Sequence, residues 1–66
     1  MKLLTLSEEI EKAIQEEIKA QEKYRQAAKD APDPETRSML EQLASDEAQH
    51  EKMLKEKLAA LKMLGK

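Results

Sequence analysis

Apolar residues recur at intervals of three and four along two long stretches of the chain. The first stripe runs through Ile10, Ile14, Glu17, Gln21, Tyr24 and Ala28. The second runs through Leu40, Leu43, Glu47, His50, Leu54, Leu58, Leu61 and Leu64, with Met39 and Met53 beside it. Such spacing is typical of α-helices that turn one side toward a core. The pattern therefore predicts an all-α protein with two amphipathic helices.

A short segment rich in proline and aspartate, residues 30–34, separates the two stripes. Each proline disfavours helix at the residue before it, and Asp33 followed by Pro34 is typical of a helix N-cap and first helical position. The sequence predicts helices at about residues 6–30 and 34–64, joined by a loop at residues 31–33. Together they form a single domain, an antiparallel helical hairpin over residues 1–66.

Capping residues mark the outer ends of the hairpin. Thr5 lies three residues before Glu8, the spacing of a capping box, and Ser7 is an alternative cap. Gly65 follows the last apolar position of the second stripe, and glycine commonly follows the end of a helix. We therefore expect the first helix to begin near Thr5 and the second to end just before Gly65.

Two apolar stripes are more than a single hairpin can cover, because a pair of helices shares one groove. A second copy on a two-fold axis would supply the missing cover, and four helices are the smallest arrangement with an enclosed core. The chain has no cysteine, so disulfides cannot stabilise it. We expect a homodimer, or a higher even oligomer, in which hairpins pair into a four-helix bundle.

Charge and hydropathy exclude two classes of partner. The net charge is -2 with acids and bases interleaved, and there is one aromatic residue for base stacking, so we expect no nucleic acid partner. No apolar run approaches the roughly 20 residues of a membrane span, and the opening residues are too short for a signal peptide. The chain is expected to be soluble and cytoplasmic, with no membrane partner.

Three polar residues interrupt the apolar stripes at one height of the hairpin. With the turn centred near Pro32, Glu17 lies between the heights of Glu47 and His50. Residues three apart on a helix are neighbours on one face, so Glu47 and His50 point the same way. The sequence thus predicts a cluster of two carboxylates and one imidazole in the middle of the core.

A two-fold pair of hairpins would bring four carboxylates and two imidazoles together, a suitable ligand set for two metal ions. Two divalent ions would neutralise the four carboxylates, whereas without metal their desolvation and mutual repulsion oppose ionisation. Oxygen ligands with one imidazole per ion suit iron or manganese, and zinc and cobalt also fit. We predict Glu17, Glu47 and His50 as metal ligands, with two ions per dimer.

Two runs of sequence surround this cluster. The first is Glu17-Ile18-Lys19-Ala20-Gln21-Glu22-Lys23-Tyr24, and the second, after the proline turn, is Leu43-Ala44-Ser45-Asp46-Glu47-Ala48-Gln49-His50. Together they resemble one half of a rubrerythrin or other ferritin-like domain, over roughly residues 8–58. In that family a Glu seven residues before a Tyr, and both residues of Glu-x-x-His, bind metal. The resemblance implies a ferritin-like bundle with iron held by the three predicted ligands.

The resemblance also bears on activity and partners. It implies a ferroxidase-type oxidoreductase that oxidises Fe(II) at a site shared between two chains. Rubrerythrins that reduce peroxide usually carry a cysteine-ligated iron domain, which a chain without cysteine does not supply, so stand-alone peroxidase activity is not expected. Two-helix ferritin-like proteins also occur as cargo of encapsulin shells. Residues 61–66 do not match the apolar targeting tail of such cargo, so no shell partner is expected.

Several residues allow two interpretations. Tyr24 either fills the core or donates a hydrogen bond to a ligand carboxylate, while Asp46 is either a surface charge or orients a ligand His on a neighbouring helix. The methionines are most simply core residues. The competing function is a non-enzymatic module, a hairpin that dimerises or docks on other helices with a structural metal or none.

Overall fold

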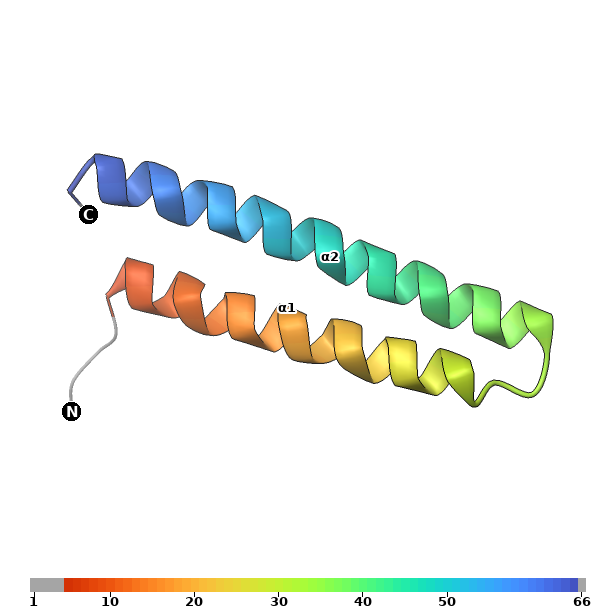
Figure 1. Ribbon diagram of the computed structural model, residues 1–66. Helices are drawn as coiled ribbons and strands as arrows, with labels where there is room; N and C mark the ends of the chain where they lie inside the picture. Colours follow the sequence, from red (N-terminus) through yellow and green to blue (C-terminus); the bar gives the residue numbers. More distant parts are fainter. Residues whose placement is uncertain (1–4, 66) are drawn as a thin grey trace.

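Two antiparallel helices joined by a short loop make up residues 5–65, the part of the chain that the computed structural model describes (Figure 1). Helix α1 spans Leu6–Lys29 and helix α2 spans Pro34–Met63. Each helix ends one residue before the expected end, because Asp30 and Leu64 occupy the C-cap positions. The predicted all-α hairpin is confirmed.

Side-chain caps begin both helices. The hydroxyl of Thr5 accepts a hydrogen bond from the Glu8 backbone N–H at 3.2 Å, and Glu8 Oε1 accepts one from the Thr5 N–H at 2.9 Å, so the capping box is confirmed. Asp33 accepts hydrogen bonds from the N–H of Thr36 at 2.9 Å and from its hydroxyl at 2.8 Å. These caps fix where each helix begins.

Past the end of α2, the backbone reverses into the left-handed region. Gly65 has a φ of +74°, which a residue without Cβ adopts at little steric cost. This is the conformation that commonly follows a helix C-cap. The predicted role of Gly65 in ending the second helix is therefore confirmed.

Small residues dominate the contact between the helices. Ile14, Ala28 and Ala44 are buried, together with one polar side chain, Gln21. Other members of the stripes are half-buried, namely Ile10, Tyr24, Leu40, Leu43, Leu54, Leu58 and Leu61. Alanine lets two helices approach closely but removes little apolar area from water. A single hairpin therefore leaves its predicted core half open.

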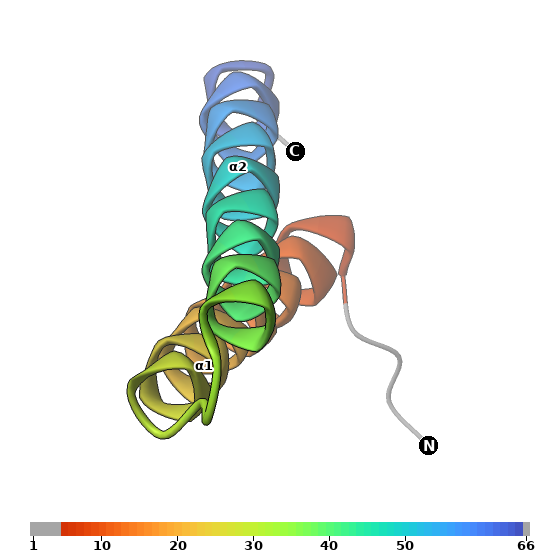
Figure 2. The same ribbon diagram turned by 90° about the vertical axis from the view of Figure 1, so that its right-hand side faces the viewer.

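Some residues expected in the core are exposed. Met39 and Met53 are 55% and 64% exposed, and Leu64 is 71% exposed. The sequence places these residues in the core of a paired four-helix bundle, so their burial there stays a prediction, and the single hairpin leaves them uncovered. The reason is geometric: each helix is covered only where it faces the other, and Met39 and Met53 lie at the edge of their stripe, while Leu64 lies past the end of α2. In Figure 2 the two helices are seen nearly end-on, crossing at an angle, with no further layer on either side.

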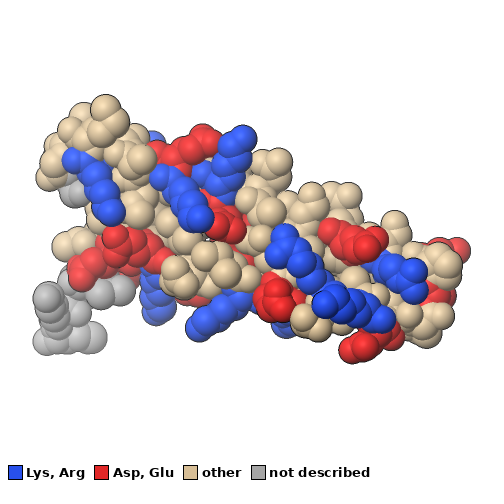
Figure 3. All heavy atoms as spheres, in the orientation of Figure 1, with Lys and Arg blue, Asp and Glu red and all other residues tan. Residues whose placement is uncertain are grey.

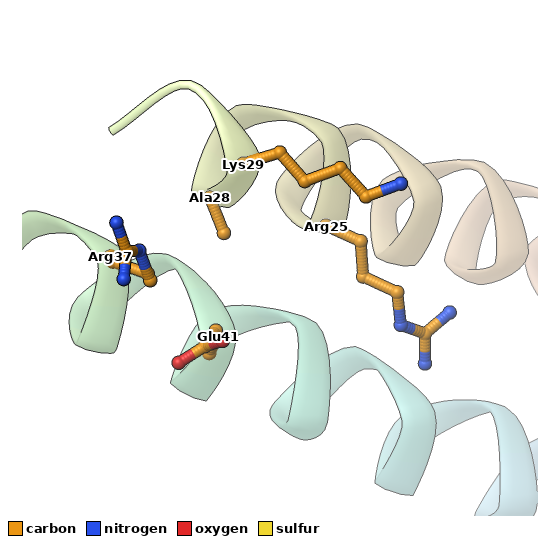
Figure 4. A pocket seen from close by; sticks show the side chains of 5 residues that line it. All are labelled: Arg25, Ala28, Lys29, Arg37 and Glu41. Carbon is orange, nitrogen blue, oxygen red and sulfur yellow. The ribbon is translucent and has the colours of Figure 1, made fainter. Parts of the chain in front are cut away.

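Two grooves run along the helix pair, one on each side. The first encloses about 570 Å³ and is lined by Ala13, Glu17, His50, Met53, Leu54 and Lys57; we call this side the open face. The second lies nearer the turn and is lined by Arg25, Ala28, Lys29, Arg37 and Glu41 (Figure 4). The helical period places the two lining sets on opposite sides of the plane that contains both helix axes. Glu17 and His50, two of the three predicted ligands, thus border the first groove and not the second.

Charged side chains of both signs are interspersed over both helices on the side that Figure 3 shows. Within residues 5–65, neither helix has an apolar stretch of the length and hydropathy that crossing a bilayer requires. The expected absence of a nucleic acid partner and the cytoplasmic location stay predictions.

We expect loss of the Thr5 cap to weaken the hairpin. Thr5→Ala removes the acceptor for the Glu8 N–H and should lower the free energy of unfolding by about 1 kcal/mol. Urea unfolding followed by circular dichroism at fixed protein concentration measures this. Ser38→Ala is the matched control, because it removes a hydroxyl from an exposed position inside α2. An equal loss of stability in both variants would contradict the capping role.

Candidate metal centre

Glu17 from α1 and Glu47 and His50 from α2 converge near the middle of the hairpin. Nδ1 of His50 lies 3.1 Å from Oε2 of Glu17 and 3.5 Å from Oε1 of Glu47. One ligand atom from each of the three residues can be chosen so that all lie within 4.8 Å of one another. The structure thus brings together the three residues that the sequence places at one height.

The three side chains are not equally buried. The side chains of Glu17 and Glu47 are 22% and 21% exposed, whereas that of His50 is 54% exposed. His50 was expected inside the core of a paired bundle, and in the single hairpin its side chain is exposed, so its burial stays a prediction. Three residues advance a helix by about 300°, so His50 lies about 60° around α2 from Glu47 and away from α1. Its imidazole therefore lies at the rim of the groove on the open face.

Glu17 and Glu47 make a side-chain hydrogen bond that raises the pKa of Glu47 above its ordinary value. Burial and the negative charge of Glu17 raise it further, while the imidazole of His50 acts in the opposite direction. Two carboxyl groups in such a contact favour holding a proton between them. A divalent cation bound there would replace this proton and compensate both carboxylates.

The chemistry of these donors fits a divalent ion of the iron type. Two carboxylate oxygens and one imidazole nitrogen are ligands that suit iron and manganese and that zinc also accepts. Three donors from one hairpin leave positions on an ion for ligands from elsewhere. A single hairpin would therefore supply only part of such a metal site.

A comparison with known families fits this arrangement. The family model for rubrerythrin matches residues 2–63, which include both helices and all three candidate ligands. The chain belongs to the rubrerythrin family. Neither the curated proteins nor the solved structures compared gave a match. The resemblance inferred from the sequence is thereby confirmed, and the family together with the carboxylate and imidazole cluster indicates an iron-binding carboxylate protein.

Tyr24 and Asp46, the two residues predicted to support the ligands, have other neighbours in this rubrerythrin-family hairpin. Lys23 Nζ lies 5.1 Å from the centre of the Tyr24 ring, and within residues 5–65 the Tyr24 hydroxyl makes no hydrogen bond with Glu17 or Glu47. Asp46 is exposed and accepts a hydrogen bond from Gln42 at 2.9 Å. Tyr24 was expected to donate to a ligand carboxylate, and Asp46 to orient a His on a neighbouring helix. Both supporting roles stay predictions.

A polar pair that the sequence reasoning missed joins the helices at the same height. Gln21 is 6% exposed, and its Nε2 donates to Oε1 of Glu51 at 2.6 Å. Hydrogen bonds from Lys55 and Gln21 lower the pKa of Glu51 below its ordinary value. Gln21 lies within the apolar stripe, which is a signal for a buried polar contact. Nothing in the sequence distinguishes Glu51 from the other glutamates of α2.

The shared hydrogen bond makes a testable prediction about protonation. In the metal-free protein the carboxyl of Glu47 should titrate above its ordinary pKa of 4.5. Glu17→Gln should lower that pKa, since the amide can donate to an ionised Glu47 and carries no negative charge. Carbon-detected NMR of the side-chain carboxyl measures both values, and Glu16→Gln, on an exposed part of α1, is the control. If the pKa of Glu47 were the same in Glu17→Gln as in the unmodified protein, the contact between Glu17 and Glu47 would be contradicted.

Raising the Glu47 pKa also sets the sign of its effect on stability. The folded chain holds the proton more tightly than the unfolded chain, so Glu47 opposes folding at neutral pH. This opposition should fade as the pH falls through the folded pKa. Glu47→Gln should remove this part of the pH dependence in urea unfolding of the metal-free protein.

Proposed function

We propose that two hairpins pair through their open faces into a ferritin-like four-helix bundle, and that the site they share oxidises Fe(II). The observation that carries the proposal is the convergence of Glu17, Glu47 and His50 beside a groove in a rubrerythrin-family chain. Two copies would supply four carboxylates and two imidazoles. That is the donor set of ferritin-like carboxylate sites.

Exposed apolar side chains support pairing through this face. Met53 lines the groove and is 64% exposed, and Met39, 55% exposed, lies on the same side of α2. A two-fold partner placed there would bury these side chains together with the exposed imidazole of His50. Pairing would thus complete the core and bring the second set of donors to the first.

In this proposal the residues bind and compensate charge, while iron, as the substrate, supplies the electrons. Glu17 and Glu47 would bind the ion through their carboxylate oxygens, and His50 would offer the nitrogen that faces them. Two Fe(II) ions each lose one electron, and dioxygen takes up both electrons with two protons to give hydrogen peroxide. Zinc would fit the same donors but has no accessible electron to give, so it would make the site purely structural.

Iron oxidation tests the proposal directly. Fe(II) added without air and then exposed to air should be oxidised faster than in buffer, at about one iron per chain, as followed by near-ultraviolet absorbance. His50→Ala should weaken Fe(II) binding by about tenfold or more, since a ligand is lost. Gln49→Ala changes the exposed neighbour of His50 and should leave binding intact. Binding without faster oxidation would favour a structural metal, and undiminished binding by the His50 variant would refute the ligand assignment.

Light scattering tests the pairing. The metal-loaded protein should have the mass of a dimer or a higher even oligomer at micromolar concentration. Met53→Glu places a charge on the open face and should shift the mass toward the monomer, since burying an unpaired charge is costly. Ser45→Glu, beside the opposite groove, is the control and should leave the mass unchanged. A monomeric metal-loaded protein, or equal dissociation of both variants, would contradict pairing through the open face.

A further inference from the structure

The buried contact between the helices offers little resistance to sliding. Its buried apolar residues are one isoleucine and two alanines, Ile14, Ala28 and Ala44. Small apolar surfaces attract without direction, so they specify the relative height of the two helices only weakly. Beyond the short loop, directional contacts between the helices therefore set the heights of Glu17 and of its partners on α2.

The hydrogen bond from Gln21 to Glu51 is such a contact. Gln21 is 6% exposed, and both ends of its amide are used, since Nε2 donates to Glu51 at 2.6 Å and Oε1 accepts from Arg25 at 3.2 Å. Glu51 is equally occupied, because its second carboxylate oxygen pairs with Lys55. The result is a continuous series of polar contacts, from Arg25 through Gln21 and Glu51 to Lys55, that joins α1 to α2.

This bond lies at the height of the candidate site. Helical side chains lean toward the N-terminus of their own helix. Gln21 therefore leans toward Glu17, one turn earlier on α1, and Glu51 leans toward Glu47, one turn earlier on α2. Because the helices are antiparallel, the two side chains approach from opposite directions and meet level with the ligand cluster. Sliding α1 in either direction would stretch or compress the bond.

We propose that Gln21 and Glu51 are a positioning pair, whose hydrogen bond holds Glu17 opposite Glu47 and His50. Occupying both oxygens of Glu51 also keeps this carboxylate, the direct neighbour of His50, out of the ligand set. The inference rests on the proposed function for its effect on metal binding. Its effect on the helix register can be measured without metal.

Three variants separate positioning from simple stability. Gln21→Leu removes the donor, while Glu51→Gln keeps an oxygen that can accept from Gln21. The double change Gln21→Leu and Glu51→Leu replaces both polar partners by apolar ones. This restores packing between the helices but not the directional hydrogen bond. Gln26→Leu is the matched control, because Gln26 donates to Glu22 within α1 and is exposed.

Co(II) is the probe, since its visible spectrum reports the geometry of its ligands. Gln21→Leu and the double variant should bind Co(II) about tenfold or more weakly, a change of about 1.4 kcal/mol, with an altered spectrum. Glu51→Gln and Gln26→Leu should keep the affinity and spectrum of the unmodified protein. A double variant with restored melting temperature but weakened Co(II) binding would support positioning. Unchanged affinity and spectrum in both leucine variants would overturn it.

NMR of the metal-free protein makes the inference testable even if the metal site fails. Contacts between the His50 ring protons and the Glu17 side chain should weaken in Gln21→Leu and persist in Glu51→Gln. If the unmodified protein binds no Co(II) while these contacts respond as expected, the proposed function falls and the positioning of the three side chains stands. If the contacts between His50 and Glu17 are unchanged in Gln21→Leu, the positioning role of Gln21 and Glu51 is refuted, whatever the result with Co(II).

Discussion

Two carboxyl groups facing each other between thinly packed helices are the constraint on which this molecule depends. Glu17 and Glu47 are each about one-fifth exposed, and they make the hydrogen bond that raises the pKa of Glu47. A proton or a bound cation relieves the repulsion between two such carboxyl groups. A chain with this little buried apolar surface has few other contacts to offset the cost. Stability and ion binding are therefore coupled in the same few side chains.

Small buried residues between the helices allow close approach but bury little apolar area. Ala28 and Ala44 let the helices come close enough for side chains from both to meet. The same small residues leave methionines and the imidazole of His50 uncovered. A larger buried residue at these positions would fill the core and push the carboxylates apart. The close approach that brings the three side chains together thus also leaves the open face uncovered.

Periodicity and turn chemistry were enough to predict the hairpin and the height of the candidate ligands. The helix starts followed from Thr5 and Asp33, whose side chains do cap α1 and α2. The exposure of His50 and Met53 could not be predicted in this way, since a stripe does not show how wide a sector the other helix covers. The hydrogen bond between Gln21 and Glu51 could not be predicted either, because their backbone positions lie at different heights and only the lean of both long side chains brings them together.

Glutamine at position 21 is the residue type that this contact requires. Its amide can donate to Glu51 and accept from Arg25 at the same time, whereas a carboxylate could only accept. Glutamate there would also add a charge one turn from Glu17 and face Glu51 with a second negative group. A neutral amide joins the helices without changing the charge that a bound ion must balance. The candidate ligand carboxylates and the proposed positioning pair could therefore share one height of the hairpin without competing for the same cation.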